Sequence, residues 1–91
     1  MAIKTQGSAT TVSSIILKPV KNGVGGVQVT IIGAASYYIR VTLDGLSYAE
    51  HPNATGIQAI NKTIWLPFPV ETIEIKIESV TGTVTATLLE E

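Results

Sequence analysis

The stretch Thr72–Leu88, with the sequence TIEIKIESVTGTVTATL, decides the fold class of this chain. Apolar side chains occupy every second position in two separate runs, namely Ile73, Ile75 and Ile77, and then Val84, Ala86 and Leu88. Because successive side chains of a strand point to opposite faces of a sheet, each run predicts a strand with one buried and one solvated face. With Ser79–Gly82 as the turn between them, the two runs predict a β-hairpin whose six apolar side chains lie in the core.

Similar patterns continue upstream and are interrupted by turn residues. Five further strands are expected, and these are Val12–Val20, Val24–Ile32, Tyr37–Leu43, Leu46–Ala49 and Ile57–Leu66. Asn22-Gly23 and Asp44-Gly45 are typical of tight hairpin turns. Thr and Ile occur twelve times each and Val nine times, and these β-branched residues pack well on a pleated sheet. The sequence therefore predicts an all-β fold with little helix, a small antiparallel β-sandwich of about seven or eight strands, jelly-roll or immunoglobulin-like.

The size and composition of the chain indicate one folded domain. Of the 91 residues, 45% are hydrophobic and only 14% are charged, which is too apolar for a disordered segment. We expect residues 1–8, small and polar around Gly7, to form a flexible N-terminal arm, and residues 9–91 to form a single domain. A domain of this size buries a limited core, and the chain has no Cys and one His, so neither disulfides nor a soft metal site is available to stabilise it. Association with its own copies is the remaining common route, and we expect a homo-oligomer.

Charge and hydropathy argue against two classes of partner. The formal net charge is −1, and no run of basic residues is present to follow a phosphate backbone, so we expect no nucleic acid. No apolar run approaches the length of a membrane span, and the first residues lack the apolar core of a signal peptide, so we expect no membrane. The chain is expected to be made in the cytoplasm of its producer.

No group of residues matches a catalytic, cofactor or metal motif. Gly23–Gly26 continues into the strand residues Val27–Ile31 instead of the helix that a phosphate loop requires, so a turn followed by a bulge at Gly25-Gly26 is favoured. His51 is expected to be a solvated loop histidine without a nucleophile in reach. Glu74 and Glu78 are expected on a solvated strand face. We therefore expect no enzyme activity, no cofactor and no metal.

Large aromatic side chains are the best candidates for partner contacts. Trp65 is flanked by Ile64 and Leu66, which favours a role in the core or in a subunit contact over a platform for sugar rings. The residues expected to contact a partner are Ile3, Tyr37, Tyr38, Tyr48, Trp65 and Phe68.

Three segments together suggest a family. Ile64–Pro69, Thr72–Ile77 and Gly82–Ala86 form an aromatic-proline turn, a polar-apolar strand and a Gly-Thr-Val strand near the chain end. This arrangement resembles the closing strands of small β-sandwich virion proteins of tailed bacteriophages, and it covers about the last thirty residues. The resemblance implies a capsid decoration, cement or head-fibre type of subunit, and it transfers no functional residue.

The expected function is therefore a structural component of the virion. We expect it to bind the major capsid protein, another virion protein or its own copies through whole surfaces. A carbohydrate-binding or receptor-binding β-module is the alternative, and a small hydrolase, for which no nucleophile arrangement is seen, comes third. Solution mass separates the first two, because a trimer or larger ring favours assembly and a monomer with saccharide affinity favours the module.

Overall fold

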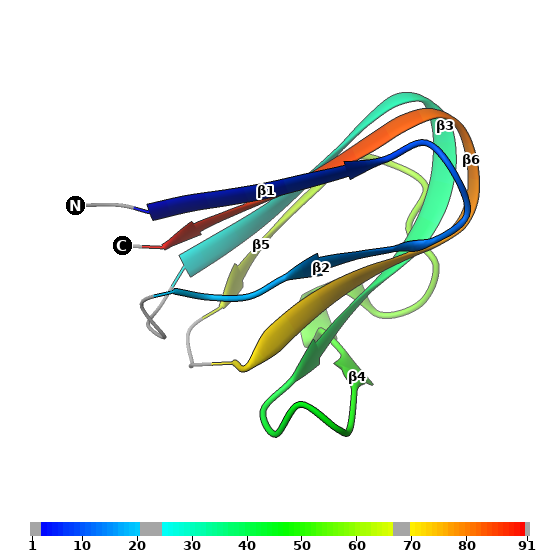
Figure 1. Ribbon diagram of the computed structural model, residues 1–91. Helices are drawn as coiled ribbons and strands as arrows, with labels where there is room; N and C mark the ends of the chain where they lie inside the picture. Colours follow the sequence, from blue (N-terminus) through cyan, green and yellow to red (C-terminus); the bar gives the residue numbers. More distant parts are fainter. Residues whose placement is uncertain (1–2, 21–24, 67–69, 91) are drawn as a thin grey trace.

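The computed structural model describes residues 3–20, 25–66 and 70–90, which form six strands and one short 3-10 turn (Figure 1). The strands are β1 (Ile3–Ala9), β2 (Ser14–Leu17), β3 (Gly25–Thr42), β4 (Ala49–Glu50), β5 (Lys62–Leu66) and β6 (Thr72–Glu90). The turn, η1 (Pro52–Ala54), lies between β4 and β5. All pairings between these strands are antiparallel, so the predicted all-β class is confirmed.

Two long strands, β3 and β6, organise the whole sheet. They pair with each other from Gly25↔Glu90 to Thr42↔Thr72, and each is flanked by a different short strand on either side of a central bend. The first half of the sheet consists of β1, residues 83–90 of β6, residues 25–32 of β3, and β5. The second half consists of β2, residues 72–77 of β6, residues 37–42 of β3, and β4. One continuous sheet therefore supplies two four-stranded layers.

The bend lies where two glycines face each other across the long pair. Gly33 and Gly82 are paired and have φ angles of 98° and 112°, a region that side chains with a Cβ rarely adopt. A Cβ on Gly33 would lie 2.2 Å from the Thr81 carbonyl oxygen, and one on Gly82 would lie 2.0 Å from that of Ile32. The sharp bend therefore depends on glycine in both strands, and Figure 1 shows β3 and β6 turning over together at this point.

An extra residue in β6 explains the change of alternation that the sequence displays. Ser36 pairs with Ser79, whereas Tyr37 pairs with Ile77, so Glu78 has no partner position on β3. A bulge of one residue moves all following side chains to the opposite face. The predicted hairpin is therefore wrong, because residues 79–82 continue β6 instead of forming a turn, although all six predicted apolar side chains are buried as expected.

The two halves enclose a single hydrophobic core. Val27, Val29 and Leu88 from the first half belong to the same buried cluster as Ile39 and Ile75 from the second half. β1 and β2 approach closely at the open side, since a Cβ on Gly7 would lie 2.8 Å from Cγ2 of Ile15. The sheet is thus folded over itself around the core, with the long strands as its closed side.

Strand boundaries differ from the predictions in several places. β3 and β6 each combine two predicted strands, so the described residues contain six strands where about seven or eight were expected. Residues 3–9 pair with β6 as β1, so most of the predicted arm is part of the sheet. Within Ile57–Leu66 only β5 is a strand, and Gln58 forms an isolated bridge with Tyr37.

The first predicted hairpin is also not formed. Within Val12–Val20 only β2 is a strand, and it pairs with β6, whereas the following strand, β3, pairs with β4, β5 and β6. The Asn22-Gly23 turn lies outside the described residues. The predicted bulge at Gly25-Gly26 is absent from the pairing, which keeps its register there with both β5 and β6.

Candidate binding surfaces

The Asp44 loop joins β3 to β4, but it is longer than the predicted tight turn, because residues 43–48 lie outside the strands and the predicted strand Leu46–Ala49 is replaced by β4. Gly45 has a φ of 80°, and Oδ1 of Asp44 accepts hydrogen bonds from the backbone N–H groups of Leu46 and Ser47 and from the hydroxyl of Thr42. These donors stabilise the carboxylate, with Ser47 contributing most, and lower the pKa of Asp44 to about 2. The turn is therefore built by local side-chain chemistry.

His51 is buried, which corrects the expected solvated histidine. Only 3% of its surface is exposed, its Nε2 lies 2.9 Å from the carbonyl oxygen of Trp65, and its backbone N–H donates to the carbonyl of Ile39. A carbonyl oxygen only accepts, so Nε2 is the donor in this contact. His51 thus connects β5 to the segment before η1. Its partner, the carbonyl of Trp65, is 14 residues away in the sequence, so the neighbours of His51 do not reveal it.

The neutral face is the outer surface of the first half of the sheet, and it carries uncharged polar side chains on four adjacent strands. Its members are Gln6, Ser8, Gln28, Thr30, Thr63, Thr85 and Thr87. Nε2 of Gln6 donates to Oγ1 of Thr87 at 3.1 Å, and the hydroxyls of Ser8 and Thr85 are 3.1 Å apart. Thr87 is also opposite Gln28, and Gln28 is opposite Thr63. A row of hydroxyl and amide groups therefore crosses the sheet.

The Trp65 groove lies beside this row. It has a volume of about 410 Å³ and is lined by Lys4, Gly26, Val27, Gln28, Thr63, Trp65, Thr87 and Leu89. The six-membered ring of Trp65 lies against Gly26, where a Cβ would be 3.2 Å from Cζ3. Trp65 is 69% exposed, so the predicted core role is wrong and the other two roles stay predictions. Among the described strands, β5 pairs only with β3, so Trp65 lies on an edge strand.

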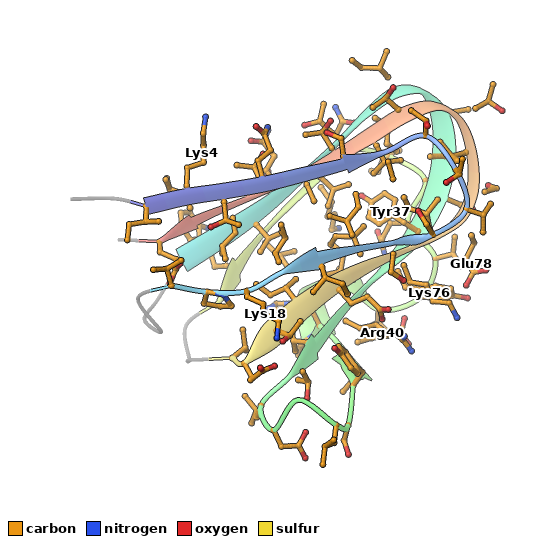
Figure 2. All side chains as sticks on the ribbon, in the orientation of Figure 1. Lys4, Lys18, Tyr37, Arg40, Lys76 and Glu78 are labelled. Carbon is orange, nitrogen blue, oxygen red and sulfur yellow. The ribbon has the colours of Figure 1, made fainter. Side chains whose placement is uncertain are left out.

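The charged face is the outer surface of the second half, and it carries paired ionic side chains. Nε of Arg40 donates to Oε1 of Glu74 at 2.8 Å, and the hydroxyl of Ser14 donates to Oε2 of the same carboxylate at 2.8 Å. The Arg40 guanidinium also lies 5.5 Å from the ring centroid of Tyr48. A hollow of about 450 Å³ is lined by Tyr38, Arg40, Tyr48, Ala49, Glu50, Lys76 and Glu78. Figure 2 shows Arg40, Lys76 and Glu78 close together and far from Lys4.

The expected contact residues are distributed over different environments. Tyr37 is fully buried, and its hydroxyl donates to the carbonyl of Ile60 at 2.5 Å, so its ring belongs to the core instead of the surface. Burial raises the pKa of Tyr37 to about 12. Ile3 is half-buried in β1, and Tyr38 and Tyr48 lie on the charged face. Phe68 lies outside the described residues.

Large apolar side chains surround the bend, and the sequence analysis did not identify them. Val12, Ile32, Ile57 and Ile60 are between 57% and 70% exposed. Their segments flank the two long strands near the bend, because the Ser13 carbonyl accepts from Ile77 N of β6 and Gln58 bridges Tyr37 of β3. Oδ1 of Asn61 also accepts from Ile31 N, so the segment that holds Ile60 lies beside the part of β3 that holds Ile32. We call these four residues the apolar end.

Within residues 3–20, 25–66 and 70–90, no three His, Asp or Glu side chains form a group that could hold a metal ion. Among the same residues, no helix has the length and apolar character needed to cross a membrane. Comparison with protein-family models, curated proteins and solved structures finds no match for the chain.

Proposed function

We propose that this protein is a non-enzymatic structural subunit that assembles with its own copies, as a decoration or cement-type component of a tailed-phage virion. The observation that carries the proposal is the apolar end. Four aliphatic side chains from three chain segments are more than half exposed around one bend, in a domain whose core is already filled by other residues. The resemblance of the closing strands to small virion proteins supports the assignment to a tailed-phage virion.

The energetic argument concerns the apolar area at this end. Removing exposed apolar surface from water stabilises an interface by roughly 25 cal/mol per Å², and contiguous apolar surface on a soluble domain often marks a contact site. A standard interface buries about 800 Å² per partner. The chain exposes 4984 Å², so such an interface covers about one sixth of that surface. The four side chains of the apolar end would form the apolar centre of such an interface.

We also assign the folded sheet to the β-sandwich class, of jelly-roll or immunoglobulin-like type, because its two halves enclose one core. This architecture leaves the bend, the loops and both outer faces available for contacts. A sandwich subunit of this kind binds through surfaces, which agrees with an assembly role in contact with a capsid protein or with another copy.

Paired surface variants test the assembly role. Ile32→Ser combined with Ile60→Ser removes apolar surface at the apolar end, and Leu43→Ser combined with Leu46→Ser removes a similar amount in the loop between β3 and β4, where both leucines are exposed. Sedimentation velocity should show an oligomer for the unmodified chain and for the loop variant. The apolar-end variant should weaken self-association at least about tenfold, or 1.4 kcal/mol.

Circular dichroism should show an unchanged fold for both variants, because all four positions are exposed. A monomeric unmodified chain, or an apolar-end variant that associates as strongly as the loop variant, contradicts the proposal.

A further inference from the structure

The single tryptophan of the chain lies at the edge of the neutral face, is largely exposed and is outside the apolar end. We propose that the Trp65 groove binds a neutral oligosaccharide, with one pyranose ring packed against the indole and its hydroxyl groups bonded to Gln28, Thr63 and Thr87. This site lies outside the apolar end and is independent of the proposed assembly role.

The indole is held in place although it is exposed. Its backbone pairs with Gly26, its ring rests against the same glycine, and its carbonyl oxygen accepts the hydrogen bond from the buried His51. Gly26 provides room for this packing, because even a Cβ there would lie 3.2 Å from Cζ3 of the indole and would press against the ring. A ring held before binding loses less conformational entropy when a ligand packs against it.

The polar lining of the groove matches the chemistry of a sugar. A pyranose ring presents C–H groups on its faces and hydroxyl groups around its edge, so it needs an apolar surface beside hydrogen-bonding groups. Trp65 and Leu89 supply apolar surface, whereas the hydroxyls of Thr63 and Thr87 and the amide of Gln28 both donate and accept. Binding sites for small molecules have mostly apolar walls and a few polar groups that fix the orientation of the ligand.

The charge of the lining selects a neutral ligand. Lys4 is the only charged side chain among the described residues that line the groove. One lysine at a solvent-exposed rim contributes little binding energy to an anion and is screened by salt. The volume of about 410 Å³ lies within the range of about 300–1,000 Å³ typical of small-molecule sites. A few linked sugar rings therefore suit the groove better than a charged ligand.

The charged face has a hollow whose lining differs from that of the Trp65 groove, and it provides a control position for the Trp65 variant. Its lining includes Arg40, Glu50, Lys76 and Glu78, and Tyr48 already contacts the Arg40 guanidinium. Tyr48 thus provides an exposed aromatic side chain outside the Trp65 groove.

Fluorescence of the only tryptophan reports directly on this site. The unmodified chain is titrated with the hexasaccharides of β-1,4-glucose, α-1,4-glucose, N-acetylglucosamine and mannose, up to about 10 mM, which saturates a site with a Kd of about 1 mM. At least one sugar should give a saturable emission shift and protect Trp65 from acrylamide quenching. The affinity should change less than about twofold between low and high salt, because the ligand is neutral.

Calorimetry with that sugar compares the variants. Trp65→Ala should weaken binding at least about tenfold and Gln28→Ala about threefold to tenfold, whereas Tyr48→Ala and the Ile32→Ser, Ile60→Ser variant should bind like the unmodified chain. All five changed positions are on the surface, and circular dichroism checks that the fold persists. The proposal is overturned if none of the sugars gives a saturable response, or if Trp65→Ala binds the sugar as tightly as the unmodified chain. Neither result affects the assembly role.

Discussion

The two halves of the folded sheet are built from the same two long strands, yet only their inner sides are alike. Toward the core, both present small and branched aliphatic side chains, such as Val29 and Ala86 in the first half and Ile39 and Ile75 in the second. Toward solvent, the first half carries the neutral face and the second half carries the charged face. The inward-facing positions, every second residue of a strand, must be apolar to fill the core. The outward-facing positions between them are free to differ in chemistry.

The two outer faces differ in how far their side chains are already engaged with one another. On the charged face, Arg40 and Glu74 bond to each other, so part of their binding capacity is already used. On the neutral face, Trp65 keeps most of its surface exposed beside uncharged polar groups. The neutral face also has internal hydrogen bonds, from Gln6 to Thr87 and between Ser8 and Thr85, but its indole is open to an external ligand.

Core truncations in the two halves should have the largest effect and should be equivalent. Ile75→Ala in the second half and Leu88→Ala in the first should each lower the free energy of unfolding by about 2–5 kcal/mol, because a fully buried side chain is lost and a cavity remains. Urea unfolding should show one transition with an unchanged slope for both, since the halves share one core. A loss below about 0.5 kcal/mol, or separate transitions for the halves, contradicts the single-core account.

Disturbing the bend that separates the halves should have the next largest effect. Gly82→Ala should lower the free energy of unfolding by roughly 2 kcal/mol, because a side chain is disfavoured at this φ and its Cβ meets the Ile32 carbonyl. Gly56→Ala is the matched control, since Gly56 also has a positive φ but a Cβ there has no atom within 4 Å. Equal losses for the two variants in urea unfolding would show that the close contact at the bend is unimportant.

Tyr37 links the second half to the segment before β5, and its removal should have a moderate effect that depends on pH. Tyr37→Phe should cost about 0.5–1.5 kcal/mol through loss of the hydrogen bond to Ile60. The pKa of Tyr37 is raised to about 12 by burial, whereas an unfolded tyrosine titrates near 10. The neutral form is favoured in the folded state, so this contribution is complete below about pH 10 and is lost as pH rises toward 12.

Thermal unfolding of both proteins between about pH 9 and 12 measures this contribution. The difference between the unmodified chain and Tyr37→Phe should shrink across that range. A constant difference would contradict the burial of the phenol.

The Asp44 loop at the end of the second half should show the smallest effect, confined to acid. The pKa of Asp44 is lowered to about 2, against about 3.9 for an unfolded aspartate. Its stabilising effect is therefore complete above about pH 4 and is lost as pH falls toward 2. In Asp44→Asn, the free energy of unfolding should therefore fall less between about pH 4 and pH 2 than in the unmodified chain. NMR titration of the Asp44 carboxyl should give the low pKa directly. A normal pKa would contradict the loop hydrogen bonds.

Local chemistry explains what the sequence predicted well. The six apolar positions of Thr72–Leu88 follow from side-chain alternation. The chain reversal at Asp44-Gly45 follows from an acceptor and a glycine at adjacent positions, although the loop is longer than the predicted tight turn. Both features depend only on residues within a few positions of one another, so a single sequence contains enough information to find them.

Long-range pairing explains what the sequence could not predict. A change of alternation at residues 78–82 is compatible with either a turn or a bulge, and the choice depends on Gly33 facing Gly82 across the sheet. Trp65 has two apolar neighbours, but it lies on the outer face of β5, whereas Ile64 on the same strand is buried against the core. His51 has polar neighbours, yet its partner is a carbonyl of β5. In each case the deciding contact comes from a distant part of the chain.

The solution mass of the unmodified chain tests the assembly role most directly. One chain has a mass of 9.6 kDa, and multi-angle light scattering measures the mass of the assembly without reference to its shape. At about 100 µM, ten times a Kd of about 10 µM, we expect a mass that is a multiple of this value and that decreases on dilution. A mass of 9.6 kDa at every concentration would contradict the proposal that the chain assembles with its own copies.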